Sequence, residues 1–212
     1  MKKFIVFILL FGSFISANEA EEIIEKIQGV YQKINLIRID FDRVQTFKLS
    51  GIQNTTSGVM FLGKNDLFRM ENEEQTVVTD GKNIWTYSTI NQQVIIDLVQ
   101  KNRSTFMPKE LLFSYGDRYY ANLIDSFEKD GAKWHTVKLT PKNPAERSLK
   151  SLKILVKDKQ WYIYNIDYVD LNGNLTSFKI KKIDTKQKMT PGLFEFEIPK
   201  EAKVMDLRKR HG

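Results

Sequence analysis

The feature that most constrains the fold is a succession of short segments in which apolar and polar residues alternate. In the first segment, Ile37, Ile39 and Phe41 alternate with charged residues, as in a half-buried strand. Turn signals such as Asp80-Gly81 separate the later segments. We predict further strands at residues 55–62, 67–71, 75–79, 83–87, 92–98, 118–124, 133–140, 149–156, 161–168 and 175–183, and an irregular tail from residue 194. Because parallel neighbours need long crossovers, this close spacing predicts antiparallel pairing.

A sheet of about ten or eleven strands tends to curl, split or close. Several segments are apolar on both faces, most clearly residues 161–166, so the sheet needs cover on both sides. Helical spacing at residues 19–35, with Asn18 as N-cap, and a short helical segment at 108–113 could supply that cover. We therefore predict a mainly β (α+β) fold. Its core is a single open, strongly curved antiparallel sheet, an incomplete barrel, with helices covering the concave face.

The N-terminus has the pattern of a secretory signal peptide. Two lysines precede an apolar run over residues 4–11, and small residues follow as far as Ala17. The run is shorter than the roughly 20 apolar residues of a membrane span, although a retained anchor is the alternative. We expect residues 1–17 to be removed and residues 18–212 to form one domain in the periplasm. Loss of the two lysines lowers the formal net charge from +7 to +5.

Composition argues against most catalytic classes. The chain has no Cys and only 2 His, at His135 and His211, which excludes thiol catalysis and Cys-ligated metals and leaves little for a His site. Nucleophile-elbow, zinc-protease and P-loop motifs are absent. Asp40 and Asp42 share a strand face, so a carboxylate-based hydrolase stays open as an alternative. Basic residues are mixed with acidic ones, and we expect no nucleic-acid partner.

Binding of an apolar ligand explains more of the composition. The chain contains 14 Phe, 8 Tyr and 3 Trp, many of them on predicted strands. On one face of a curved sheet, such side chains form either a packed core or a cavity for an acyl chain. Periodicity does not separate these two possibilities. The candidates for the inner wall are Phe41, Met60, Leu62, Phe68, Met70, Trp85, Tyr164 and Phe178.

Several segments resemble the outer-membrane lipoprotein carrier proteins, the LolA family. Residues 58–70 contain the family's glycine, apolar strand, basic turn and Phe-containing strand, and residues 78–87 look like its next hairpin. Residues 194–199 are similar to its closing segment, and residues 106–112 to its lid. The order and spacing of these segments carry the resemblance, which spans most of the chain.

The resemblance implies a periplasmic chaperone that is not an enzyme and needs no cofactor. Such a carrier receives lipoproteins from an inner-membrane ABC transporter, shields their acyl chains in a cavity and passes them to an outer-membrane acceptor. We expect a monomer. Lys64 stands where the family has an Arg that holds the lid, and the implied lid and latch are Lys64, Arg69, Phe106, Met107, Pro108, Leu111 and Leu112. A carrier of another lipid, or an envelope-stress sensor domain on the same fold, remains the alternative.

Overall fold

The computed structural model describes residues 12–99, 119–143 and 149–208. Within them, helix α1 (Gly12–Tyr31) accompanies a single twelve-stranded sheet. The strands are β1 (Leu36–Thr46), β2 (Gln53–Gly63), β3 (Leu67–Asn72), β4 (Gln75–Asp80), β5 (Asn83–Ser88), β6 (Gln93–Leu98), β7 (Tyr119–Lys129), β8 (Ala132–Pro141), β9 (Leu149–Lys157), β10 (Ile163–Asp170), β11 (Leu175–Asp184) and β12 (Lys203–Asp206).

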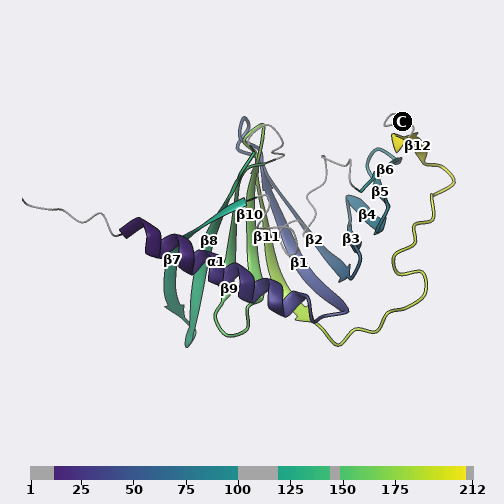
Figure 1. Cartoon of the computed structure of the whole chain (residues 1–212). Helices are drawn as coiled ribbons and strands as arrows, with labels where there is room; N and C mark the ends of the chain where they lie inside the picture. Colours follow the sequence, from purple (N-terminus) through teal and green to yellow (C-terminus); the bar gives the residue numbers. More distant parts are fainter. Residues whose placement is uncertain (1–11, 100–118, 144–148, 209–212) are drawn as a thin grey trace, which may run out of the picture.

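The sheet runs in the order β12-β6-β5-β4-β3-β2-β1-β11-β10-β9-β8-β7, which confirms the predicted series of strands. Two expectations are wrong. The tail from residue 194 is not irregular throughout but contains β12, and the sheet is mixed because β12 pairs with β6 in parallel. The tail after β11 is long enough to bring β12 beside β6 in the same direction, as Figure 1 shows.

Helix α1 differs from the prediction at both ends. It begins at Gly12, so Asn18 lies inside the helix and is not its N-cap, and it ends at Tyr31 rather than near residue 35. At its end, the N–H of Ile34 donates to the carbonyl of Tyr31 before the chain enters β1. Among the described residues, no helix has the length and apolar content to cross a bilayer. The predicted helix at 108–113 lies outside the described residues.

The core lies between α1 and the face of the sheet that we call the concave face. Ile23, Ile24 and Ile27 of the helix pack with apolar residues of the sheet in one continuous cluster. Figure 1 shows α1 crossing in front of β7–β9. The hydroxyl of Tyr31 accepts a hydrogen bond from the backbone N–H of Ile163, which ties the end of the helix to β10.

Candidate functional site

The concave face carries rows of apolar side chains that run across neighbouring strands. Residues that pair directly in a sheet point to the same face. Ile39 pairs with Met60, and Met60 with Met70. Leu62 pairs in the same way with Phe68. Most of the predicted inner-wall residues are therefore on this face and at most 9% exposed: Phe41, Met60, Leu62, Phe68, Met70 and Phe178.

Phe41 occupies the middle of the concave face. Its ring centroid lies 5.2 Å from that of Phe178 on β11, at an interplanar angle of 58°. Opposite it on β2 stands Gly58, where a Cβ atom would lie 2.7 Å from Cζ of Phe41 and 2.4 Å from the carbonyl oxygen of Glu71. The glycine is needed here because any side chain would collide with the ring and with β3.

The concave face becomes polar on the β1–β2 hairpin side of Phe41. Arg43 forms an ion pair with Glu74 in the β3–β4 turn, and the Asn54 side chain donates to the same carboxylate. Three buried atoms nearby, Nε of Arg43, Oγ1 of Thr56 and Nδ2 of Asn72, have no hydrogen-bond partner among the described residues. The face thus joins an apolar floor to a polar end with unused hydrogen-bonding capacity, an arrangement that suits an amphiphilic ligand.

The structure corrects the placement of Trp85. Its neighbour Ile84 pairs with Thr79 and belongs to the concave core, whereas Trp85 pairs with Val78 and Ile96 on the outer face. Strand β5 carries large apolar residues on both faces, so alternation alone does not indicate which of them points inward. Trp85 does not line the concave face.

Tyr164 is a second correction, and a β-bulge explains it. The register of β10 against β9 shifts between Ile163 and Asn165, so Ile163 and Ile166 both face the core. The ring of Tyr164 packs instead on Trp134, with centroids 5.1 Å apart. An extra residue in one strand reverses the alternation beyond it, which the sequence pattern does not reveal.

His135 is held among structural partners. It is 4% exposed, stacks on Trp161 and lies with Nδ1 2.8 Å from Oγ of Ser126. Its burial, followed by the charge of Lys133, lowers the pKa of His135, and the carboxylate of Asp158 opposes these effects. These effects favour the neutral form of the imidazole, and its buried position leaves little access for a substrate.

Asp40 and Asp42 lie on the outer face, each beside a cation. Asp40 is 3.0 Å from Arg38 and borders an open depression of about 500 Å³, while Asp42 is 2.8 Å from Nζ of Lys181. Hydrogen bonds from Lys181 and then from Ser57 lower the pKa of Asp42. A general acid needs the opposite shift. Among the described residues, no group of three His, Asp or Glu is arranged to hold a metal ion.

Comparison with known proteins decides the family. The sequence profile of "Outer membrane lipoprotein carrier protein LolA" matches residues 32–197. The chain belongs to the LolA family. The outer-membrane lipoprotein carrier protein of Pasteurella multocida is 26% identical over 202 residues, which cover 93% of each chain. That of Shewanella baltica is 24% identical over 206 residues, covering 95% of this chain and 92% of the relative.

Two solved structures share the fold of this LolA-family chain. An uncharacterised conserved protein from Thermus thermophilus matches with a TM-score of 0.58 and 11% identity, over 89% of this chain and 99% of that one. A putative outer membrane lipoprotein-sorting protein domain from Vibrio parahaemolyticus matches with a TM-score of 0.50 and 8% identity, over 84% and 97%. At these identities the likeness concerns the fold alone.

The two expected latch cations occupy different surroundings in this LolA-family member. Lys64 is exposed in the turn between β2 and β3. Arg69 lies on the outer face, where its Nη1 donates to the carbonyl oxygens of Leu193 and Glu195 at 3.2 and 3.1 Å. Arg69 therefore fastens the C-terminal tail to the outside of the sheet. The expected lid residues Phe106, Met107, Pro108, Leu111 and Leu112 lie outside the described residues.

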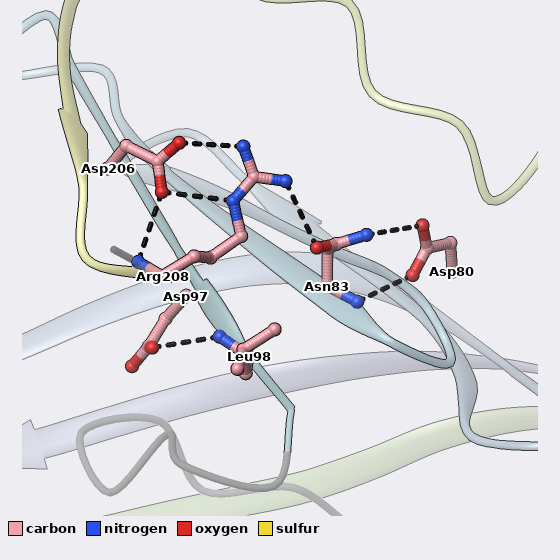
Figure 2. A network of polar contacts seen from close by, with 6 residues as sticks. All are labelled: Asp80, Asn83, Asp97, Leu98, Asp206 and Arg208. Carbon is pink, nitrogen blue, oxygen red and sulfur yellow. Dashed lines mark hydrogen bonds and ion pairs between the residues drawn. The ribbon is translucent and has the colours of Figure 1, made fainter. Parts of the chain in front are cut away.

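The tail ends in a polar network that the sequence pattern did not indicate. Figure 2 shows Arg208 between Asp206 and Asn83, with Nη1 3.1 Å from Oδ1 of Asn83 and Nη2 2.6 Å from Oδ2 of Asp206. Burial acts to raise the pKa of Asp80, but hydrogen bonds from Asn83 and from the backbone of Lys82 outweigh it and lower that pKa. The turn before β5, predicted only as a turn, thus also anchors β12.

Proposed function

We propose that this chain is a non-enzymatic carrier that binds the acyl chains of lipoproteins on its concave face. It takes them from an inner-membrane ABC transporter and passes them through the periplasm to an outer-membrane acceptor. The observation that carries the proposal is the apolar concave face with its polar end, in a member of the LolA family. Each buried methylene is worth about 0.8 kcal/mol, so acyl chains need cover while they cross water.

Cargo binding requires that groups now covering the concave face give way. The apolar side of α1 packs against this face, and the sheet residues beneath it are almost fully buried. We therefore propose that acyl chains take the place of contacts within this core. Met60 and Met70 suit such exchange, because unbranched thioether side chains repack easily around different shapes. A face that closes on itself when empty also keeps the unloaded carrier from aggregating.

The polar end gives the cargo an orientation. The glyceryl head of a lipoprotein carries ester carbonyl oxygens, which accept hydrogen bonds. The buried donors on Arg43 and Asn72 have unused capacity for such acceptors. We propose that acyl chains lie along Phe41, Met60 and Phe68 with their head at this end.

We propose that residues 1–17 are a signal peptide and that the mature chain resides in the periplasm. We further propose that it is a monomer. Lys64 remains the proposed latch of a lid at residues 106–112. Lys64→Leu should change the rate at which cargo is released while cargo affinity stays similar. Equal transfer rates for wild type and variant would remove Lys64 from the release step.

A matched pair of variants tests the binding face. Phe68 is buried on the concave face, whereas Trp85, on the neighbouring hairpin, points outward. Phe68→Glu should abolish capture of a triacylated lipoprotein, and Trp85→Glu should retain it, with circular dichroism showing that both fold. Equal capture by the two variants would contradict the proposal. Mass spectrometry of co-purified material identifies the cargo, and phospholipid without lipoprotein would indicate a carrier of another lipid.

A further inference from the structure

Large apolar side chains are exposed together on two hairpin loops. The β1–β2 loop presents Leu49 at 99% exposure and Ile52 at 63%. The β10–β11 loop adds a second group beside it. We name the set the tip cluster, which consists of Phe47, Leu49, Ile52, Leu171 and Leu175.

The two loops form one projection. The backbone N–H of Lys48 donates to Oδ1 of Asn174 at 3.1 Å, and the Lys48 side chain lies against Gly173, where a Cβ atom would be 2.6 Å from Cδ of the lysine. In Figure 1 both loops lie at the upper end of the sheet, where β1, β2, β10 and β11 converge. The tip cluster therefore acts as one apolar surface.

The backbone of the projection is internally hydrogen-bonded. Phe47 donates its N–H to the carbonyl of Ile52 at 2.9 Å, and Gly51 donates to the carbonyl of Phe47 at 2.8 Å. In the other loop, the N–H of Asp170 bonds to the carbonyl of Asn174 at 3.0 Å. Unsatisfied backbone groups are what make loops costly to place in hydrocarbon. This projection can enter an apolar medium with its turn-forming bonds intact.

From these features we infer that the tip cluster docks the protein on the surface of an anionic lipid bilayer. A projection cannot enclose a small ligand, whereas exposed aliphatic side chains on a loop tip fit the boundary between headgroups and acyl chains. Lys48 stands between the apolar residues and can reach anionic headgroups with its flexible stem. The chain as a whole carries a positive net charge, which adds to its attraction to anionic lipids.

The tip cluster lies close to the polar end of the concave face, which suggests a role for docking in lipoprotein transfer. This role rests on the proposed carrier function. Strand β1 runs from the tip to Arg43 and Phe41 on the concave face. At about 3.3 Å per residue, the polar end of that face lies only about 10 Å from Thr46, where the strand meets the tip. Docking would bring the end that holds the lipid head next to the membrane surface.

Vesicle co-sedimentation of the processed protein, recovered from the periplasm, tests the inference. The variants are Leu49→Asp and, as a matched control, Ile90→Asp, which alters a residue 76% exposed in the β5–β6 turn and outside the tip cluster. Vesicles of phosphatidylcholine alone and of phosphatidylcholine with phosphatidylglycerol serve as probes. Leu49→Asp should weaken binding to the anionic vesicles by on the order of 10- to 100-fold, and Ile90→Asp should bind like wild type.

The result also separates this inference from the proposed function. Capture of a triacylated lipoprotein in solution, without vesicles, should be unchanged in Leu49→Asp. If wild type ignores vesicles, or Leu49→Asp and Ile90→Asp bind them equally, the docking inference is wrong even where capture is normal. If wild type fails to capture lipoprotein, the carrier function is wrong whatever the vesicles show. Lys48→Gln should reduce the preference for anionic vesicles, and an unchanged preference would contradict the role of Lys48.

Discussion

Gly58→Ala probes the close fit at the middle of the concave face. A Cβ atom at this position would lie 2.4 Å from the carbonyl oxygen of Glu71 and 2.7 Å from Cζ of Phe41. The first neighbour is backbone and the second is a ring fully buried in the core, so neither can swing aside. Overpacking of this kind costs about 1–3 kcal/mol. Because β2 pairs with both β1 and β3 here, the added methyl group must push one of these strands.

Thermal unfolding followed by circular dichroism measures the effect. Each kcal/mol lost should lower the Tm of a chain of this length by about 2–4 °C. Gly29→Ala is the matched control, because that glycine lies in α1 and an added Cβ atom would have nothing within 4 Å of it. Replacing a helical glycine should leave stability unchanged or raise it by about 0.5–1 kcal/mol. A Gly58→Ala protein as stable as wild type would refute the described fit between Phe41 and β2.

Three further predictions concern other parts of the chain. Arg69→Met should lower stability by about 1–3 kcal/mol and speed proteolysis of the tail, because two carbonyl bonds are lost, whereas Lys64→Met should change neither. Native His135 has a lowered pKa, so the unfolded chain binds its proton first and wild type should lose stability as pH falls below 6.5. In His135→Gln that loss should shrink, as measured by the free energy of urea unfolding at several pH values. An equally strong dependence of this free energy on pH would contradict the prediction. Arg208→Met should speed hydrogen exchange at the N–H of Leu207, which bonds to β6, and unchanged exchange would show that Arg208 does not hold β12.

Much of the fold could be predicted because short-range features of the sequence, alternation and turn residues, determine most of the strands and their neighbours. Alternation places Ile39, Phe41 and Met60 on one face, and hairpin turns fix which strands are neighbours. The same signals correctly placed Phe68 and Phe178 among the inner residues. Where a strand is regular and one of its faces is buried, the alternation of apolar and polar residues is enough to predict which side chains point inward.

The wrong predictions concern residues whose position depends on irregular pairing or on contacts with distant parts of the chain. Tyr164 is itself the extra residue of a bulge that has no sequence signature, and Trp85 lies on a strand that is apolar on both faces. Part of that outer face is covered by the tail, where the ring of Phe196 lies 6.4 Å from that of Tyr87. The parallel strand β12 joins by contacts more than a hundred residues away in sequence, which no local pattern encodes.

The most direct test of the central claim is photo-crosslinking from the two faces of the sheet in living cells. A photoreactive phenylalanine replaces Phe68 in one strain and Trp85 in another, and mass spectrometry identifies the adducts. We predict that position 68 crosslinks to the acyl chains of lipoproteins and that position 85 does not. Lipoprotein adducts of equal yield at both positions, or at position 85 alone, would contradict a cargo site on the concave face.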